Sequence, residues 1–204
     1  MNILLLTGNH LRHNFFSSQL CRISHNSLHV EFQRESMIPR IPKNIQLIDK
    51  QNLKKHFNDR YNTEKKYFNK KNIQKILNKF VVKFDTDLYK EKKIINAIKD
   101  FNADICILFG VPIINENLIK ILPYNTLNIH MGLSQFYRGT ATFFWPFYFL
   151  EPNCAGITIH KVNKEIDSGD ILCQVVPRLE YGDKIHDISC KSIIKAADVL
   201  TTIN

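Results

Sequence analysis

Apolar positions along the chain fall into two spacings, one typical of strands and one typical of helices. A continuous apolar run at residues 103–109 (ADICILF) is typical of a central parallel strand covered on both faces. Alternating or continuous apolar runs predict further strands at residues 1–7, 27–33, around 128–130, 156–162 and 171–179. Apolar residues at helical spacing predict helices at residues 13–23, 90–100, 115–122 and 184–203. This alternation predicts an α/β fold with a doubly wound, mostly parallel sheet.

Two segments depart from the simple alternation. Residues 49–79 are rich in Lys, Asn and Gln with apolar residues at roughly helical intervals, which predicts a helical insertion of one or two surface helices. Residues 139–150 (GTATFFWPFYFL) predict an aromatic-rich helix whose rings pack in the core and which Pro146 shortens or kinks. We expect residues 1–204 to form a single domain that carries this insertion.

The composition favours a soluble protein. Hydrophobic residues make up 44% and charged residues 23% of the chain, which is ordinary for a globular domain. No apolar run approaches the ~20 residues of a membrane-spanning helix, and the start MNILLLTG lacks the basic lead of a signal peptide. We therefore expect a cytoplasmic protein without membrane contact. The five cysteines show no CxxC spacing and the histidines no metal-ligand pattern, so we expect free thiols and no metal site.

The formal net charge of +9 raises the question of nucleic-acid binding. Many lysines lie between residues 50 and 99, interleaved with asparagines rather than with aromatic residues that could stack on bases. This distribution favours a solvated helical face, so no nucleic-acid partner is expected. A positive field would also attract a polyanionic small substrate.

Polar residues gather where the predicted strands end. Asn128 and His130 lie two apart on one strand, so their side chains point the same way. A buried histidine with a hydrogen-bond partner is the structural explanation of such a pair. In an open parallel sheet, however, ligands bind beyond the carboxyl ends of the strands, where we also expect the loop at residues 8–14 (GNHLRHN) and Asp167 of the turn EIDSGD. Gly169 is expected to supply a left-handed residue in that turn.

Two stretches carry a resemblance to a known family. They are NIHMGLSQFYRG at residues 128–139 and AGITIHKVNKEIDSGDILCQ at residues 155–174, and together they resemble the formyltransferases that use 10-formyltetrahydrofolate. The resemblance implies that family's Rossmann-like fold and 10-formyltetrahydrofolate as the co-substrate. It also implies that Asn128, His130 and Asp167 are the catalytic residues.

The chemistry of formyl transfer suits these residue types. An amine attacks the formyl carbon through a tetrahedral oxyanion, which the Asn128 amide can stabilise by ~3 kcal/mol, a typical value for one donor. His130 can donate to the same oxygen and move a proton near neutral pH, and Asp167 can orient that imidazole. Met131-Gly132 and Gln135 replace the family's Pro-Ser and a later Pro, which changes the loop rather than these three groups.

The resemblance also places the pterin ring of the donor between two segments, held largely by backbone groups. One wall is the segment Phe109, Gly110, Val111, Pro112 and Ile113, and the other consists of Val162, Asn163, Lys164 and Ile166. Gly110 is expected to let a flat ligand approach the backbone.

The first-strand loop bears on the acceptor. Glycinamide ribonucleotide formyltransferases carry a Gly-Ser-Asn phosphate cradle there, which GNHLRHN lacks. We also do not expect the RNA-binding domain that methionyl-tRNA formyltransferases add. Sugar N-formyltransferases are then the most similar subfamily, which implies a nucleotide-linked amino sugar as acceptor, as in lipopolysaccharide O-antigen biosynthesis. The expected acceptor contacts are Asn9, Arg12, His13 and Arg138.

Other functions stay open at this stage. They are a glycinamide ribonucleotide formyltransferase-like activity, hydrolysis of 10-formyltetrahydrofolate by the same three residues, and a folate- or nucleotide-binding module without turnover. A homodimer is also left open.

Overall fold

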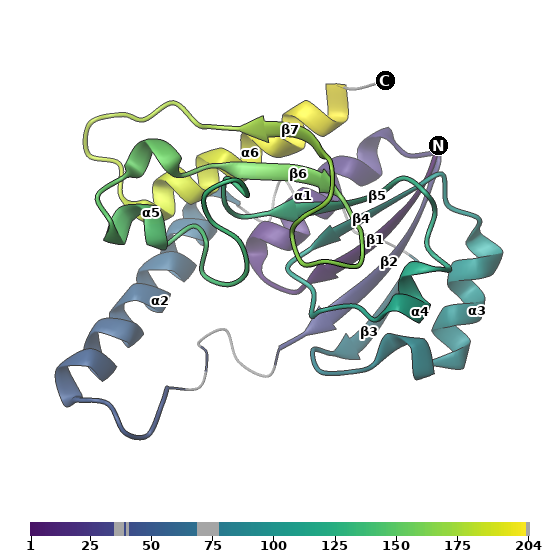
Figure 1. Cartoon of the computed structure of the whole chain (residues 1–204), viewed down its shortest axis with the longest axis horizontal. Coiled ribbons are helices and arrows are strands. Elements are labelled where there is room, and N and C mark those ends of the chain that lie inside the picture. Colours follow the sequence, from purple (N-terminus) through teal and green to yellow (C-terminus); the bar gives the residue numbers. More distant parts are fainter. Residues whose placement is uncertain (35–38, 40, 69–77, 203–204) are drawn as a thin grey trace.

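The computed structural model describes residues 1–34, 39, 41–68 and 78–202. These residues form a seven-stranded sheet in the order β3-β2-β1-β4-β5-β6-β7 (Figure 1). The strands are β1 (Asn2–Gly8), β2 (Asn26–Gln33), β3 (Lys79–Lys83), β4 (Ile105–Phe109), β5 (Thr126–His130), β6 (Ile157–Lys161) and β7 (Ile171–Val175). The first five strands run parallel, whereas β6 pairs antiparallel with both β5 and β7. The predicted α/β fold with a mostly parallel sheet is confirmed.

Helices cover both faces of the sheet. They are α1 (Leu11–Ile23), α2 (Leu47–Tyr67), α3 (Lys92–Phe101), α4 (Glu116–Ile119), α5 (Trp145–Tyr148) and α6 (Ile185–Thr202), with short 3₁₀ turns at Leu88–Lys90 and Pro152–Cys154. The alternating side chains of β1 explain this arrangement. Ile3 and Leu5 pack in a core with α1 and α6, whereas Leu4 and Leu6 pack in a second core with α3. A strand apolar on both faces needs a helical layer on each side.

The predicted helical insertion at residues 49–79 corresponds to helix α2 in its first part, and strand β3 begins at its last residue. Helix α2 begins at Leu47, and residues 69–77 of the predicted insertion lie outside the described residues. Strand β3 was not predicted from the sequence. It pairs in parallel with β2 as an edge strand. Its short apolar pattern, Phe80 to Val82, is flanked by lysines in a Lys-rich stretch, so it carries too few residues to reveal a strand.

The prediction of a long aromatic helix at residues 139–150 is wrong. Only Trp145–Tyr148 is helical, because Pro146 suits the first turn of a helix but not its interior. The prediction that the rings pack in the core is also wrong for most of them. Phe143 is buried, but Phe144 and Tyr148 are 38% and 64% exposed.

Two smaller predictions can also be compared with the structure. All five cysteines are free thiols, as expected. In the part of the chain that the structure describes, no helix has the length and apolar character to cross a membrane.

Candidate active site

Strand β5 presents Asn128 and His130 on one face at the carboxyl end of the parallel strands. The alternating residues Leu127 and Ile129 point into the core beneath α1 and α6. Asn128 is half-buried and His130 is 5% exposed. The predicted pairing of the two side chains on one strand face is therefore present.

Asp167 comes from the loop between β6 and β7 and lies between these two side chains. Its Oδ2 is 3.3 Å from His130 Nδ1, and its Oδ1 accepts a hydrogen bond of 3.2 Å from Asn128 Nδ2. The Gly139 N–H donates to Oδ2 at 3.0 Å. Burial alone would raise the pKa of Asp167, but the hydrogen bonds from His130, from His160 and from the Gly139 backbone outweigh it and hold the pKa well below its ordinary value. The carboxylate is therefore charged at neutral pH.

The turn around Asp167 differs from the predicted one. Asp167 itself adopts the left-handed conformation, with φ of 50°, and Gly169 does not. A Cβ at Gly169 would collide with the carbonyl oxygen of Lys161 at the end of β6. Glycine is therefore needed here for close backbone approach rather than for a left-handed φ. This approach holds the Asp167 turn against the end of the strand.

His160 completes the site and was not identified as a site residue from the sequence. It lies opposite Asn128 in the antiparallel β5–β6 register. Its Nδ1 is 2.9 Å from the Lys161 carbonyl, so Nδ1 carries a hydrogen, and its Nε2 lies 3.2 Å from Asn128 Nδ2 and 3.6 Å from Asp167 Oδ1. The side chains of Asn128, His160 and Asp167 thus meet at one point. The histidine of the motif ITIH is the signal that could have revealed this contact.

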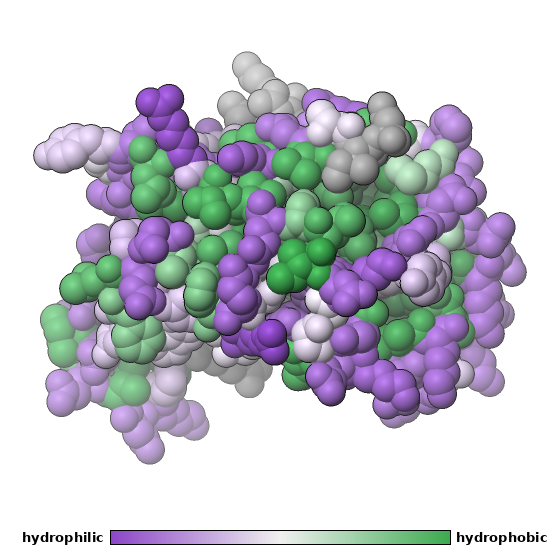
Figure 2. Space-filling model, turned by 45° about the horizontal axis from the view of Figure 1, so that its top comes forward, coloured by the Kyte–Doolittle hydropathy of each residue, from purple (hydrophilic) through white to green (hydrophobic). Residues whose placement is uncertain are grey.

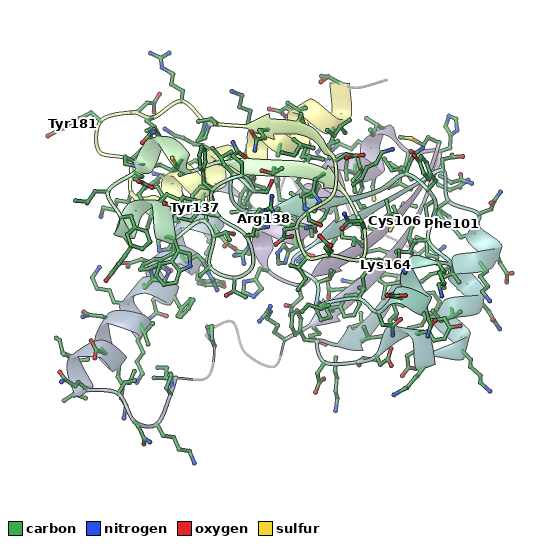
Figure 3. All side chains as sticks on the ribbon, in the orientation of Figure 1. Phe101, Cys106, Tyr137, Arg138, Lys164 and Tyr181 are labelled. Atoms are coloured by element: carbon green, nitrogen blue, oxygen red, sulfur yellow. The ribbon has the colours of Figure 1, made fainter. Side chains whose placement is uncertain are left out.

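The loop after β5 covers His130. The Tyr137 carbonyl lies 2.8 Å from His130 Nε2, while His130 Nδ1 faces Asp167. His130 thus lies beside an anionic Asp167, and the loop that covers it carries Tyr137 and Arg138, which are labelled in Figure 3.

The loop is fastened to β6 by Thr158. Thr158 Oγ1 accepts from the Ser134 N–H at 3.0 Å and donates to the Gly132 carbonyl at 2.8 Å. These two bonds hold residues 132–134, the start of the loop. Further along the loop, the contacts of Tyr137 with His130 and of Gly139 with Asp167 hold it over the site.

The two predicted walls of the donor pocket lie next to each other. Val111 and Val162 pack against the same core cluster. Lys164 of the second wall forms an ion pair of 3.3 Å with Glu116 of α4, the helix that follows the first wall. Ile113 and Ile166 are 81% and 57% exposed and could contact a ligand.

Other members of these walls have structural roles. Phe109 is 1% exposed and packs in the core. The Asn163 side chain accepts hydrogen bonds from the Glu165 N–H and the Ser168 hydroxyl, so it shapes the turn before Asp167. Pro112 is half-buried, and no polar contact defines its role.

The expected role of Gly110 needs correction. A Cβ at Gly110, whose φ is +67°, would lie 2.5 Å from His13 Nε2, and a Cβ at Gly8 would lie 2.5 Å from His13 Nδ1. The space beside Gly110 is therefore filled by His13 rather than open to a flat ligand. His13 is 3% exposed and its ring contacts Phe109 edge-on at 4.6 Å between centroids. Burial holds its pKa well below the ordinary value, so it is neutral and is not the predicted phosphate contact.

Of the remaining predicted acceptor contacts, Arg12 and Asn9 contact other helices and loops of the protein, whereas Arg138 lies on the loop that covers His130. Arg12 forms an ion pair with the buried Glu64 of α2, and thus ties α1 to the helix beside it. Asn9 Oδ1 accepts from the Arg34 N–H at 3.4 Å. Arg138 is exposed on the loop that covers His130, and its Nε donates to the Ser134 carbonyl at 2.8 Å. Arg138 is thus the predicted contact that the structure places beside the catalytic candidates.

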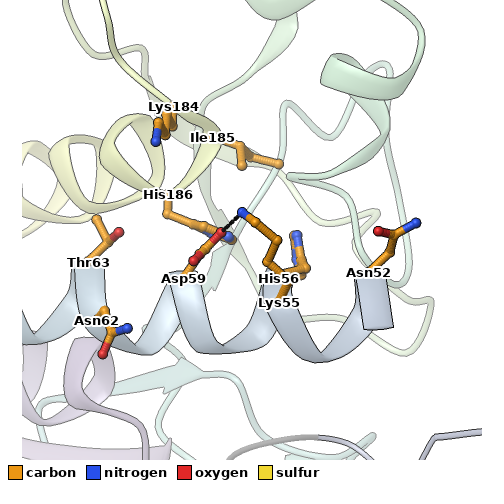
Figure 4. Close-up of a pocket in the computed structure, with 9 residues that line it drawn as sticks. All are labelled: Asn52, Lys55, His56, Asp59, Asn62, Thr63, Lys184, Ile185 and His186. Atoms are coloured by element: carbon orange, nitrogen blue, oxygen red, sulfur yellow. Dashed lines mark hydrogen bonds and ion pairs between the residues drawn. The ribbon is translucent and has the colours of Figure 1, made fainter. Parts of the chain in front are cut away.

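A separate hollow of ≈ 360 Å³ lies between α2 and the start of α6 (Figure 4). His56 and His186 face each other there with ring centroids 4.6 Å apart, and Lys55 pairs with Asp59 at 2.7 Å. Asn128, His130 and Asp167 do not line it. Within the described residues, no group of three or more His, Cys, Asp or Glu side chains could hold a metal ion.

Comparisons with known proteins identify the family of this chain. Residues 12–200 match the family described as formyl transferase. A methionyl-tRNA formyltransferase of Borreliella burgdorferi (strain ZS7) is 30% identical over 104 residues, which are 50% of this chain and 33% of that protein. The chain thus spans about a third of the length of this curated relative.

Solved structures show the same fold at low identity. A phosphoribosylglycinamide formyltransferase from Anaplasma phagocytophilum has a TM-score of 0.62 at 15% identity, covering 97% of this chain and 81% of its own. A sugar N-formyltransferase from Shewanella sp. FDAARGOS_354 has a TM-score of 0.57 at 17% identity, covering 98% of this chain and 67% of its own.

Proposed function

Because this chain belongs to the formyl transferase family, we propose that it moves a formyl group from 10-formyltetrahydrofolate to the amine of a nucleotide-linked amino sugar. The observation that carries the proposal is the contact of Asp167 with both Asn128 and His130 at the carboxyl end of β5. A carboxylate, an imidazole and an amide in one partly buried site are what acyl transfer to an amine requires.

The proposed reaction begins with attack of the amine nitrogen on the formyl carbon. The carbonyl oxygen becomes an oxyanion, the bond from the formyl carbon to the folate nitrogen breaks, and one proton leaves the amine while the folate nitrogen gains one. His130, oriented by Asp167, donates from Nε2 to the oxyanion. Asn128 donates as well once its amide turns from His160 or Asp167 toward the substrate.

Substrate binding requires the covering loop to move. The Tyr137 carbonyl lies where an oxyanion would need to be, 2.8 Å from His130 Nε2. We infer that the formyl oxygen replaces this carbonyl when the donor binds. The loop would then close over the reactants and exclude water, which favours transfer to an amine over hydrolysis.

The proposal that the acceptor is a nucleotide-linked amino sugar rests on Arg138. Its exposed guanidinium stands eight residues past His130, on the loop that covers the reacting groups. A pyrophosphate group on the acceptor would suit such a side chain. The solved neighbours include a sugar N-formyltransferase, whose name supports this class without assigning a particular sugar.

A second candidate acceptor is aminoacyl-tRNA, because the curated relatives are methionyl-tRNA formyltransferases. The net charge of +9 suits it as well. Phosphate contacts spread over many lysines would make binding fall steeply with salt, and single substitutions would then matter little. A nucleotide sugar bound by one or two arginines would behave in the opposite way.

The test is mass spectrometry of candidate amines after incubation with the protein and 10-formyltetrahydrofolate. The panel contains nucleotide-linked amino sugars, glycinamide ribonucleotide and methionyl-tRNA, each with His130→Ala as the control. We expect formylation of an amino sugar by the wild-type protein only. Formylation of methionyl-tRNA or glycinamide ribonucleotide alone would contradict the acceptor assignment but not the transfer chemistry.

A further inference from the structure

An aromatic surface lies on α5, just after the loop that covers His130. Phe143 and Pro146 are buried beneath it, whereas the rings on the other side of the segment reach solvent. These rings, which we call the α5 aromatic face, are between 38% and 64% exposed and belong to Phe144, Trp145, Tyr148 and Phe149. Apolar side chains also reach the surface at the left of Figure 2, the side on which Figure 1 shows α5. Exposed apolar surfaces of this kind mark sites that bind a ligand or a partner.

Hydrogen bonds join the α5 aromatic face to the candidate active site. Trp145 Nε1 donates to the Thr140 carbonyl at 3.2 Å, and the neighbouring Gly139 N–H donates to Asp167 at 3.0 Å. Two residues of chain span at most ~7 Å, so the indole nitrogen lies within roughly 13 Å of the Asp167 carboxylate. Arg138, the proposed pyrophosphate contact, directly precedes Gly139 in the chain (Figure 3). The aromatic face is therefore continuous with the groups that would hold the acceptor.

We propose that the nucleobase of the acceptor stacks on the α5 aromatic face. This inference rests on the proposed function and deepens it, because it assigns the part of a nucleotide-linked amino sugar that lies farthest from the reacting amine. With the amine at His130 and the pyrophosphate at Arg138, the ribose and base extend toward α5. Stacking of a base on aromatic side chains requires only a flat π-face, which every nucleobase has.

The rings are ordered before a ligand binds. Phe144 and Tyr148 contact Trp145 edge-on, at interplanar angles of 74° and 88° and with 5.4 and 5.8 Å between ring centroids. Such edge-to-face contacts are favourable, and the hydrogen bond to Thr140 fixes the indole further. The ring of His56 on α2 contacts Phe144 with 6.0 Å between centroids and supports it from the other side. A platform that is already ordered loses little conformational entropy when a base stacks on it.

Titration with UDP and with inorganic pyrophosphate tests the proposal in the absence of a formyl donor. Trp145 is the only tryptophan in the sequence, so a base that stacks on it should quench the intrinsic tryptophan fluorescence. By calorimetry, we expect UDP to bind about tenfold more tightly than pyrophosphate, which is within the range that stacking of one base supplies. Trp145→Leu should remove this difference by weakening UDP binding and leaving pyrophosphate binding unchanged.

Two further variants complete the binding test. Tyr148→Ala keeps the fluorophore and should weaken UDP binding several-fold. Tyr124→Ala is the matched control, because Tyr124 is 86% exposed but precedes β5 at the opposite end of that strand, and it should leave both affinities unchanged. Urea unfolding of each variant confirms that it is folded. Equal affinities of the wild-type protein for UDP and pyrophosphate, or UDP binding that neither Trp145→Leu nor Tyr148→Ala weakens, would overturn the proposal.

Formyl transfer is measured separately, so that this inference and the proposed function can fail independently. If the wild-type protein and Tyr148→Ala formylate a nucleotide-linked amino sugar with the same KM, the base site is wrong and the proposed function stands. If UDP binds as expected but no nucleotide-linked amine is formylated, the base site stands and the proposed acceptor is wrong. Trp145 fluorescence that changes with protein concentration and with no nucleotide would show a second copy on the α5 aromatic face, and would overturn the inference.

Discussion

At the scale of single residues, the site depends on how the two oxygens of Asp167 are shared. One oxygen accepts from the Asn128 amide, and the other faces the His130 imidazole and the Gly139 N–H. The side chain is only 10% exposed, so water does not replace a lost partner easily. This carboxylate therefore fixes the position of the His130 imidazole.

Asp167→Asn tests the role of that charge. The amide can present only one acceptor oxygen, so its NH₂ group must face an N–H donor of His130, Asn128 or Gly139. We expect kcat to fall by ~10²-fold or more with the fold intact. Asp170→Asn, in the same turn but exposed, is the matched control and should keep normal kcat. Equal rates for the two variants would remove Asp167 from the proposed mechanism.

Arg138→Ala tests the acceptor contact. Loss of a charge-assisted hydrogen bond costs ~1–3 kcal/mol, so KM for the acceptor should rise by about tenfold or more while KM for the donor stays unchanged. Arg22→Ala, an exposed arginine in the last turn of α1, is the control. A KM for every acceptor that Arg138→Ala leaves unchanged would place the acceptor elsewhere.

At the scale of elements, the antiparallel pairing of β5 with β6 assembles the site. The register sets His160 beside Asn128, and the close approach of Gly169 to Lys161 holds the Asp167 turn over both. No single element carries all the reacting groups. Small changes in how β6 ends should therefore affect catalysis without removing a reacting side chain.

Gly169→Ala tests this positioning. The added Cβ would collide with the Lys161 carbonyl and displace the Asp167 turn, so kcat should fall by about tenfold or more, an effect like that of a reacting group moved by ~1 Å. Gly182→Ala is the control because Gly182 has a φ of +88° in a loop away from Asp167. It should lower stability by about 1 kcal/mol and spare kcat. Equal loss of kcat in both variants would point to general destabilisation instead.

The elements also show what could be predicted from the sequence. Strands β1 and β4 were predicted because their apolar runs are continuous, as burial on both faces demands. Asn128 and His130 were predicted because they share a strand face. His160 was not identified as a site residue, although a histidine stands in the motif ITIH, because its contact with Asn128 depends on the β5–β6 register.

Two other predictions failed for physical reasons, one local and one not. The aromatic run at residues 139–150 carries helical spacing, but Pro146 confines the helix to four residues and leaves Phe144 exposed. Helical spacing shows that apolar residues share one side of a helix, but it does not show whether that side packs against another element. His13 was expected to contact phosphate because it follows the first strand. Its burial between Gly8 and Gly110 depends on the approach of β1 to β4, which lies beyond any local window.

At the scale of the whole molecule, several histidines are buried in neutral form. Burial lowers the pKa of His10 to about 2, of His29 to about 3 and of His186 to about 4. Each binds fewer protons in the folded state than in the unfolded state, where the pKa is about 6.5. By linkage, the stability that they contribute is present above about pH 6.5 and is lost as pH falls toward the folded values.

The protein should therefore lose stability as pH falls from about 6.5 to about 4, as measured by urea unfolding across that range. His186→Asn should flatten this dependence because it removes one of the titrating groups. Asn52→Ala, an exposed residue that lines the same hollow and does not titrate, is the control and should leave the slope unchanged. A free energy of unfolding that stays constant over this window would show that these histidines are not buried as described.

The most direct test of the central claim is a single-turnover measurement of formyl transfer from 10-formyltetrahydrofolate to the amino-sugar panel, with wild-type protein and His130→Ala. Urea unfolding of both proteins confirms that the variant is folded. We predict that the wild-type protein forms the formylated amine and that His130→Ala forms it ~10²-fold more slowly or worse. Transfer by His130→Ala at the wild-type rate, or no transfer to any amine by the wild-type protein, would contradict the account.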